Sequence, residues 1–517
     1  MPSQSNVWNK PWSAVLLALI LLPPLGLVLL WKRPSAGLAL KAAGTLGAVV
    51  LNVAHLVILF GLRMELDGSG SRPIFYFGGR EAHYREIEES RSHEPAPAPA
   101  QEVAASLAAS AESAAPVAPP APPATAAAVR TEDAYWTDYR GPLRDGHYRQ
   151  MRILTTWPAK GLPELWRQPV GEGYASMVVA GGKVFTIEQR RDREVVAAYD
   201  FDTGRELWTD SWRGRFEESM GGPGPRTTPT WHEGELYALG AEGELRCLDA
   251  NTGKVLWRKN ILEDNGAGNL NWAMAASPLI VDDKVIVLPG GRPGRSVVAY
   301  HKLSGEPVWK ALDDKQAYTA PMLVTLAGRR QVLVVSAERV MGLTVENGAL
   351  LWDYPWRTSY DVNAAQPLIV GDNRFFISAG YGHGAAVAEV GRSGDRFTAR
   401  TVWESNRMKN KFNSSVLHEG HVYGLDEAIL ACIDAETGEQ KWKGGRYGYG
   451  QLLLADGHLV VITEQGDLVL VKATPDSHEE LVRFSAIRGK TWNVPAMASG
   501  RLIVRNTREM ACYRITP

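Results

Sequence analysis

Pairs of short apolar segments, each pair joined by turn residues, recur through the last two thirds of the chain. Residues 278–287 read Pro-Leu-Ile-Val-Asp-Asp-Lys-Val-Ile-Val, and residues 453–461 read Leu-Leu-Ala-Asp-Gly-His-Leu-Val-Val. Each pair predicts two short strands around a tight turn, because β-branched and leucine side chains flank Asp or Gly. These segments lack the 3.6-residue apolar period of a helix.

A second pattern follows most of these pairs: Asp, two residues, Thr-Gly, three residues and Trp. Its three full copies start at Asp200, Asp249 and Asp434, and weaker copies end at Trp309 and Trp352. The pattern predicts a hairpin in which Gly supplies a positive φ and the Asp and Thr side chains hold the turn. With the preceding pair, each unit has four strands in roughly 40 to 50 residues, which is typical of a β-propeller blade.

The turns between first and second strands predict eight blades. They lie at Gly182, Gly234, Asp283, Gly328, Asp372, Gly420, Gly457 and Gly500. The last unit has only three strands before Pro517, so we expect residues 164–167, with Trp166, to supply the fourth and close the ring. The predicted fold is all-β, an eight-bladed propeller over residues 163–517.

The three cysteines fall at one position of the repeat, equivalent to Ala198, Ala299 and Gly342. They are Cys247, Cys432 and Cys512. We therefore expect a small buried residue at this position, a role that cysteine fits. No spacing indicates a zinc site, and three cysteines do not form a disulfide framework.

Two apolar runs precede the propeller, Ser13 to Trp31 and Ala42 to Leu62. Each has about the 20 residues that a membrane-spanning helix needs, so residues 13–62 predict a two-helix transmembrane anchor after a tail of residues 1–12. Pro23-Pro24 predicts a kink or a break in the first run. A cleaved signal peptide is the alternative, but it leaves the second run unexplained.

Basic residues between the two runs set the expected orientation. Lys32, Arg33 and Lys41 lie there, against Lys10 in the tail. By the positive-inside tendency the loop is cytoplasmic, and the rest of the chain lies outside. We expect the inner (cytoplasmic) membrane of a bacterium, with the propeller on the periplasmic side. Residues 63–91 form a juxtamembrane segment, residues 92–130 a disordered Ala/Pro-rich linker, and residues 131–162 a lead-in arm.

Charge gives no reason to expect nucleic acid as a partner. Lys plus Arg number 56 and Asp plus Glu number 57, whereas phosphate binding requires an excess of basic charge. Gly221-Gly222-Pro223-Gly224-Pro225 lacks the Lys-Ser/Thr of a phosphate-binding loop. His383 is a lone histidine without a His or Cys close in sequence, so no metal site is expected there.

The Asp-x-x-Thr-Gly-x-x-x-Trp repeat resembles that of pyrroloquinoline-quinone-like (PQQ-like) propellers, and residues 136–146 resemble their lead-in. The resemblance implies two branches: quinoprotein alcohol or sugar dehydrogenases that use PQQ and calcium, and non-enzymatic propellers of the outer-membrane-assembly (BamB) type. The first branch has an adjacent cysteine pair and an acidic calcium cluster. No such pair occurs here, and Asp361 is the one acidic residue to nominate. The second branch carries an acylated cysteine, which Cys247, the first cysteine, does not match.

The loops that precede the first strands open around the central channel and give the candidate site. One aligned position in them reads Tyr174, Arg226, Ala275, Tyr318, Ala364, Phe412, Tyr449 and Trp492. The next position adds Asn413 and Asn493, and longer loops add Asn269, Asn271, Trp272 and Asn363. Aromatic groups with amides and an Arg suit a peptide, a sugar or a planar ligand. Alternatively, the aromatic side chains wedge between blades.

These observations favour a membrane-anchored binding or scaffolding module for a cell-envelope protein or peptide, with no catalytic residues, metal or cofactor. The alternative is a quinoprotein dehydrogenase. A third possibility is a propeller that stabilises a larger complex through its membrane helices.

Overall fold

The computed structural model describes residues 11–77, 79–92, 136–158 and 160–517. The chain divides into two compact units, one of Met1–Leu66 and Gly70–His83 and one of Asp67–Ser69 and Tyr84–Pro517. The predicted tail and the predicted linker lie outside the described residues, apart from Pro11 and Trp12 at the end of the tail and Ser92 at the start of the linker.

The first unit contains helices α1 (Trp12–Leu21), α2 (Pro23–Trp31) and α3 (Leu38–Leu59), and a hairpin of β1 (Leu62–Leu66) and β2 (Pro73–Phe77). The first apolar run breaks at Leu22, just before the predicted Pro23-Pro24 interruption. Within the described residues, α3 is the one helix long and apolar enough to cross a membrane. The 10 residues of α1 rise only about 15 Å, so a second span is not confirmed.

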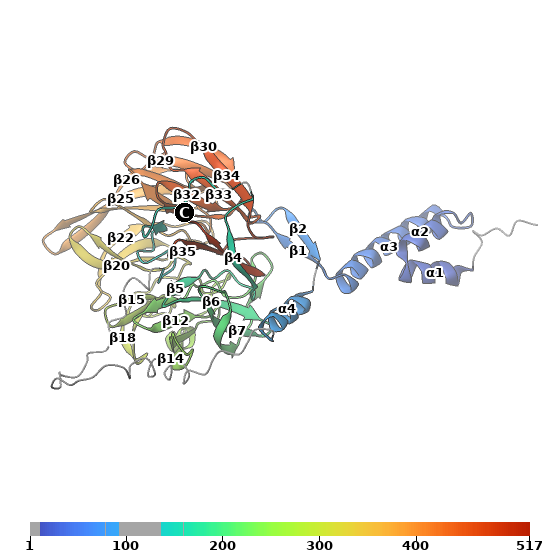
Figure 1. Cartoon of the computed structure of the whole chain (residues 1–517), viewed down its shortest axis with the longest axis horizontal. Coiled ribbons are helices and arrows are strands. Elements are labelled where there is room, and N and C mark those ends of the chain that lie inside the picture. Colours follow the sequence, from blue (N-terminus) through green and yellow to red (C-terminus); the bar gives the residue numbers. More distant parts are fainter. Residues whose placement is uncertain (1–10, 78, 93–135, 159) are drawn as a thin grey trace, which may run out of the picture. The chain divides into compact units, whose positions relative to one another are not determined.

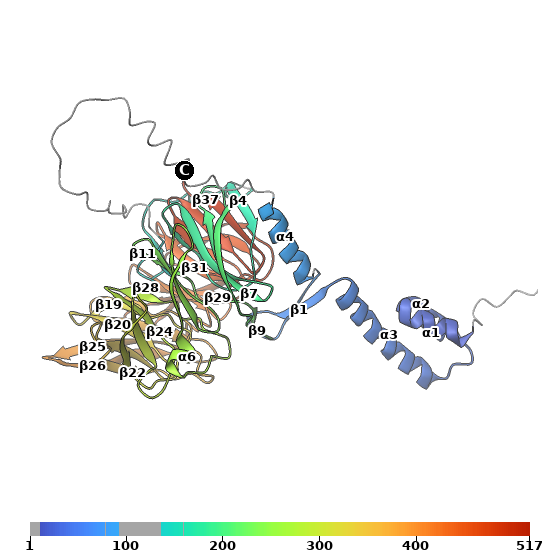
Figure 2. The ribbon, with the colours of Figure 1, turned by 90° about the horizontal axis from the view of Figure 1, so that it is seen from below.

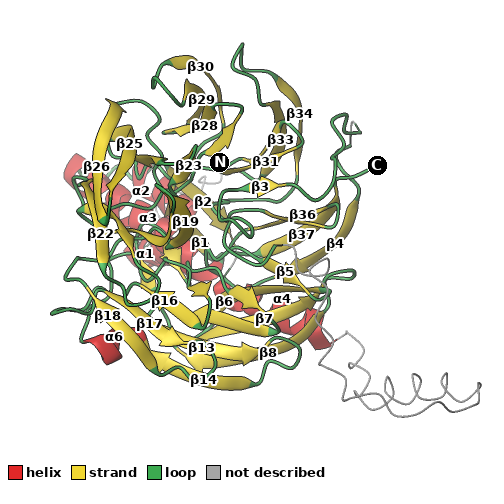
Figure 3. Ribbon diagram, turned by 90° about the vertical axis from the view of Figure 1, so that its left-hand side faces the viewer, coloured by secondary structure: helices red, strands yellow, loops and turns green. Residues whose placement is uncertain are grey.

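Eight antiparallel sheets form the propeller in the second unit (Figure 1), and in Figure 3 the blades follow one another around a central axis. Blades one to four are β5 (Val178–Ala180), β6 (Lys183–Arg190), β7 (Arg193–Asp200), β8 (Glu206–Arg213); β11 (Thr230–His232), β12 (Glu235–Leu239), β13 (Glu244–Asp249), β14 (Val255–Asn260); β15 (Leu279–Val281), β16 (Lys284–Val287), β17 (Val297–His301), β18 (Pro307–Ala311); and β19 (Met322–Leu326), β20 (Arg329–Val335), β21 (Arg339–Leu343), β22 (Leu350–Pro355). Blades five to eight are β23 (Leu368–Val370), β24 (Arg374–Ala379), β25 (Gly384–Ser393), β26 (Arg396–Ser405); β27 (Val416–His418), β28 (His421–Asp426), β29 (Ile429–Asp434), β30 (Gln440–Arg446); β31 (Gln451–Ala455), β32 (His458–Ile462), β33 (Asp467–Lys472), β34 (Glu480–Ser485); and β35 (Ala496–Ala498), β36 (Arg501–Arg505), β37 (Glu509–Arg514), β4 (Glu164–Pro169).

Smaller elements complete the described chain. They are α4 (Arg80–Ser92), α6 (Ile261–Asn265), β3 (His147–Tyr148), and a small hairpin of β9 (Glu217–Glu218) and β10 (Gly222–Pro223).

The ring closes as the sequence predicts. Strand β4 lies beside β37 (Figure 2) and pairs with it antiparallel. Trp166 is opposite Cys512 in this pairing. An N-terminal strand therefore covers the edge of β37 and completes the last blade. All eight predicted turns lie between the first and second strands of their blades.

Five of the eight blades dock a tryptophan on a turn glycine of the next blade. The Trp208 indole N–H donates to the Ala250 carbonyl of blade two at 3.2 Å, and the indole lies against Gly253, which has φ +74°. The same pairing recurs for Trp166 with Gly204, Trp257 with Gly305, Trp309 with Gly348 and Trp403 with Gly438. The glycine of the repeat thus serves two purposes: it turns the chain, and it leaves room for the neighbouring indole.

Three blades differ. Trp442 of blade six donates to the Thr474 carbonyl of blade seven at 2.8 Å, where the turn has no glycine. Strand β34 of blade seven has no tryptophan.

Blade four lacks the docking on a glycine altogether. Its Trp352 donates to Gln331 Oε1 in its own blade at 2.6 Å, and its ring stacks on Phe375 of blade five at 5.3 Å. Blade five has the stretched copy of the repeat, in which Gly394 lies at the tip of the long β25–β26 hairpin. With the turn glycine displaced, the indole packs on an aromatic ring instead.

The cysteine position is confirmed as a small buried site. Cys247, Cys432 and Cys512 are each 0% exposed, and each lies opposite the tryptophan of its blade on the neighbouring strand. A side chain there must be small because the indole fills the space. Burial raises the pKa of all three thiols to about 12.

The docking pair gives a test of stability. We expect Gly253→Ala to lower the free energy of unfolding by roughly 1–3 kcal/mol more than Gly234→Ala. Both glycines have positive φ, but a Cβ at Gly253 lies 2.5 Å from Trp208, whereas one at Gly234 meets nothing within 4 Å. Urea unfolding of the two variants measures the difference, and equal losses would show that the indole contact contributes nothing.

A buried carboxyl lies between blades one and two. Glu194 is 1% exposed; its Oε2 accepts from the Trp212 indole at 2.9 Å and its Oε1 from the Ala241 N–H at 2.8 Å. Burial raises the pKa of Glu194 from 4.5 to about 7. The folded chain therefore holds this proton in a pH range where the unfolded chain has released it.

We expect Glu194 to make the folded state less stable as pH rises. Its contribution is complete below pH 4.5 and is lost up to about pH 7, by at most about 1.4 kcal/mol for each pH unit. Glu194→Gln keeps an acceptor without the charge, so its stability should fall less between pH 5 and pH 8 than that of the wild type. Urea unfolding at both pH values tests this, with exposed Glu346→Gln as the control. A variant that follows the wild-type slope would exclude Glu194 as the cause.

Candidate functional site

The blade topology brings two sets of loops to one end of the channel. In a four-stranded antiparallel blade, the loop before the first strand and the loop between the second and third strands lie at the same end. We call this end the aromatic face. The candidate residues of the sequence come from the first set, while Glu427 and Glu464 follow the second strands of blades six and seven.

The lead-in arm closes the other end of the channel. Trp136 pairs with Val179 near the end of the first strand of blade one, and β3 pairs with β31 at Leu454 and Ala455. This explains why the five-stranded sheet of blade seven starts with β3. The residues between Trp136 and β3 therefore cross the ends of the innermost strands.

Two arginines of the arm are buried in the channel. Arg144 donates to the Pro321 carbonyl at 2.8 Å and to Asp138 Oδ1 at 3.0 Å, and Arg140 donates to the Ser415 carbonyl at 2.8 Å. These carbonyls belong to blades four and six, so the arm ties together blades that are not neighbours in the ring. Charged donors in a buried setting form strong hydrogen bonds to carbonyls.

Aromatic side chains converge at the aromatic face. The ring centroids of Phe412 and Trp492 are 4.6 Å apart, those of Tyr174 and Trp492 5.2 Å, and those of Phe412 and Tyr449 5.7 Å. We call these four residues the aromatic patch. They come from blades six, seven, eight and one, which follow one another in the ring, so they contact one another along one side of the channel mouth.

Cations border the patch. Lys490 Nζ lies 4.3 Å from the Trp492 ring centroid, and the Arg226 guanidinium lies 5.6 Å from that of Tyr174. Lys411 Nζ lies 4.9 Å from the Tyr449 centroid and 5.0 Å from that of Tyr381. Cations over ring faces are favourable, and burial lowers the pKa of Lys411.

Carboxylates hold the polar atoms of the patch. Glu464 Oε1 accepts from the Trp492 indole at 2.9 Å, and Glu427 Oε2 accepts from the Tyr449 hydroxyl at 3.0 Å. Neither glutamate was among the candidates from sequence. The topological rule above could have found them, because it assigns the loops after the second strands to this same face.

A short peptide segment already occupies the patch. The Gly68 N–H donates to Glu464 Oε1 at 2.6 Å, and the Gly68 carbonyl accepts from Lys411 Nζ at 2.6 Å. Gly68 is buried, and a Cβ there would lie 2.4 Å from the Tyr449 ring. The patch and its charged neighbours therefore bind both polar groups of one backbone residue.

The structure brings some predicted site residues together and separates others. Tyr174, Arg226, Phe412, Tyr449 and Trp492 lie in or beside the patch. Trp272 and Tyr318 form a separate pair with centroids 5.9 Å apart, and Asn271 is exposed.

Three asparagines of the candidate site lie inside the protein. Asn363, Asn413 and Asn493 are at most 1% exposed. The Asn493 amide donates to the Ala175 carbonyl of the adjacent blade at 2.8 Å, and the Asn363 amide donates to the Ser336 carbonyl at 2.9 Å. Asn413 and Asn493 follow the aligned loop position by one residue, whereas Asn363 precedes it. The amides of Asn363 and Asn493 donate to backbone carbonyls inside the protein, as buried amides generally do.

The described residues do not supply a calcium site. Calcium takes six to eight oxygen ligands, and no group of three His, Cys, Asp or Glu side chains in the described part of the chain is arranged to hold a metal ion. Glu464 and Glu427 are each engaged by a different aromatic side chain, and Asp361 binds Lys315 at 2.8 Å. The described residues therefore do not offer the arrangement of oxygen ligands that the calcium of the dehydrogenase branch requires.

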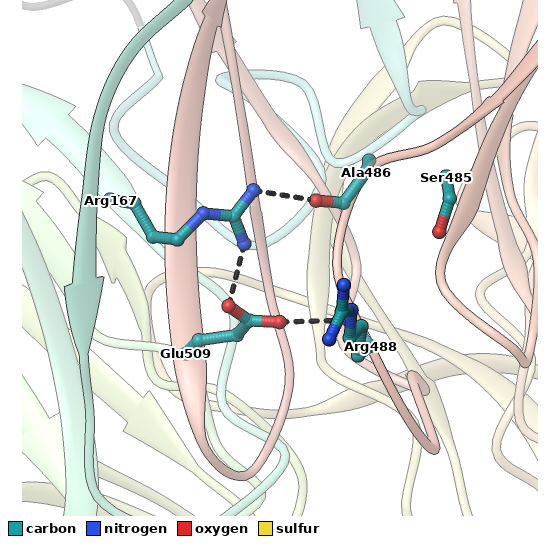
Figure 4. A pocket seen from close by; sticks show the side chains of 5 residues that line it. All are labelled: Arg167, Ser485, Ala486, Arg488 and Glu509. Carbon is teal, nitrogen blue, oxygen red and sulfur yellow. Dashed lines mark hydrogen bonds and ion pairs between the residues drawn. The ribbon is translucent and has the colours of Figure 1, made fainter.

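A cleft of about 400 Å³ lies at the closing blade and is lined by Arg167, Ser485, Ala486, Arg488 and Glu509 (Figure 4). Arg167 donates to Glu509 at 2.6 Å and to the Ala486 carbonyl at 2.7 Å, and the Arg488 N–H donates to Glu509 at 2.7 Å. These contacts hold β4 against the last blade, so the residues of the cleft stabilise the closed ring.

Comparison with known proteins agrees with this architecture. Residues 191–444 match a family described as outer membrane protein assembly factor BamB. Curated relatives of that name from Burkholderia pseudomallei (strain K96243) and Yersinia pestis are each 20% identical to this chain. The first covers 60% of this chain and 76% of the relative, and the second covers 53% and 70%.

Among solved structures, the quinohemoprotein alcohol dehydrogenase ADHIIG from Pseudomonas putida HK5 is similar. Its TM-score is 0.54 at 11% identity, over 74% of this chain and 81% of that chain. The quinohemoprotein alcohol dehydrogenase from Comamonas testosteroni gives 0.52 at 14% identity, over 75% and 81%. At such identities the likeness is one of fold.

The arm gives a prediction about the channel. We expect Arg144→Ala to lower the free energy of unfolding by roughly 2–5 kcal/mol, because it leaves buried carbonyls and Asp138 without their donor. Arg213→Ala is the control, since that side chain is 87% exposed and should cost less than about 0.5 kcal/mol. Urea unfolding compares the two. Similar small losses would mean that the arm does not tie the blades.

Proposed function

Because this chain is a PQQ-like β-propeller protein, we propose that it is a peptide- and protein-binding module of the cell envelope. The observation that carries the proposal is the binding of Gly68 by Glu464 and Lys411. A site that already holds a backbone N–H and C=O beside clustered aromatic rings has the groups needed for an extended or turned peptide.

The energetics of the patch suit such a ligand. Tyrosine and tryptophan contribute large contact areas at low entropic cost and dominate many protein interfaces. The carboxylates and ammonium groups around the patch give direction to backbone hydrogen bonds. The relatives described as outer membrane protein assembly factors support a role in which a polypeptide is the partner.

We also propose that the chain is membrane-anchored, with the propeller outside the cytoplasm. Helix α3 supplies one span by length and composition, and Lys32, Arg33 and Lys41 precede or begin it. Basic residues on that side favour a cytoplasmic N-terminal end of α3. The inner membrane of a two-membrane cell is the location that fits this arrangement.

Peptide binding at the aromatic patch can be measured on the full chain in detergent. We expect a phage-displayed library of 12-residue peptides to yield binders whose affinity falls at least about tenfold in Phe412→Ala, because central aromatic side chains contribute about 2 kcal/mol or more. Fluorescence anisotropy with the selected peptides gives the affinities. Leu303→Ala, an exposed apolar residue outside the patch, is the control. Binding that Phe412→Ala leaves unchanged would refute the patch as the site.

The dehydrogenase alternative has its own measurement. Isothermal titration of the full chain with pyrroloquinoline quinone and calcium, together with a dye-linked assay on simple alcohols and sugars, should show neither binding nor dye reduction. Micromolar quinone binding with dye reduction would replace the binding module by an oxidoreductase.

A further inference from the structure

Gly68 occupies a slot that admits only glycine. A Cβ at this residue would lie 2.4 Å from Cγ and Cδ2 of Tyr449 and 2.5 Å from its Cβ, distances that real Cβ atoms do not show. The slot is framed by the Tyr449 ring, the Glu464 carboxylate and the Lys411 ammonium. These groups contact the backbone of Gly68, and no larger side chain fits beside the ring.

The slot also recognises the residue before the glycine. Asp67 is half-buried, and its carboxylate interacts electrostatically with Lys411. The ammonium is held over two tyrosine rings, so it faces the segment in a fixed position. The slot therefore favours an acidic residue followed by glycine, the sequence of a tight turn.

We propose that this slot is a glycine-specific turn-binding site whose resident ligand is the chain's own Asp67-Gly68 segment, which an external Asp-Gly turn must displace. The inference rests on the proposed function and adds its specificity and its regulation. Asp67–Ser69 belongs to the same compact unit as the propeller, as expected of an internal segment that is bound to the propeller. Partner binding would then release the segment that follows β1.

Internal competition has a predictable size. A segment held in the same chain has an effective concentration on the order of millimolar. If the segment and an external peptide each have a Kd of about 100 µM for the slot, competition lowers the apparent affinity of the peptide about tenfold. Gly68→Ala expels the internal segment, because its Cβ collides with Tyr449, and leaves the slot itself intact. Gly79→Ala is a matched control, since a Cβ there meets nothing within 4 Å.

The experiment uses the full chain in detergent and a fluorescein-labelled peptide of residues 66–72, Leu-Asp-Gly-Ser-Gly-Ser-Arg. Fluorescence anisotropy should show that Gly68→Ala binds this peptide about tenfold more tightly than the wild type or Gly79→Ala. A peptide with Ala in place of its first Gly should not bind. Adding Lys411→Ala to Gly68→Ala should abolish binding, while urea unfolding confirms that each variant is folded.

The outcomes separate this inference from the proposed function. Equal affinity of the wild type and Gly68→Ala, or binding that tolerates Ala in the peptide, would overturn the glycine slot. If library-selected peptides still depend on Phe412 in that case, the proposed function stands alone. If neither the wild type nor Gly68→Ala binds any peptide, both proposals are wrong.

Discussion

The docking of an indole on a glycine turn is the interaction on which the ring depends. A propeller blade pairs its strands only within itself, so hydrogen bonding between strands does not join one blade to the next. At five joints a tryptophan supplies the contact: the face of its indole lies against a glycine of the next blade, as for Trp166 and Trp208, whose N–H groups also donate to that blade. Trp166 comes from the closing strand, so the joint between the last and the first blade has the same chemistry as four other joints.

The sequence predicts what is local and what repeats. Turn glycines, the tryptophans and the three-stranded last unit each carry a signal within a few residues, and β4 completes the last blade with Trp166 in the expected place. The candidate site is predicted in part, because Phe412 and Trp492 occupy equivalent positions in their blades. The sequence does not predict Glu464 or Gly68 as site residues. Glu464 follows a second strand, and Gly68 lies almost 400 residues before it in the chain. Their meeting depends on tertiary structure that no periodicity encodes.

The asparagines show why a polar residue next to an aromatic ring is easily misread. In a loop they suggest a surface, but the channel wall presents backbone carbonyls that need donors. Asn493 and Asn363 supply such donors at the joints between blades, as Gln451 does with the Trp492 carbonyl at 2.9 Å. Two arginines are thus buried at one end of the channel and aromatic rings border the other, with amides along the wall between them.

The irregular joint after blade four lets one blade grow. The Trp352 N–H donates within its own sheet, and the ring contacts blade five through Phe375. Blade five therefore does not need a tight glycine turn beneath this indole. Its outer hairpin is free to extend into two 10-residue strands, β25 and β26. A repeat architecture can therefore accept a longer hairpin in one blade. The condition is that the tryptophan of the preceding blade packs on another planar group, as Trp352 packs on Phe375.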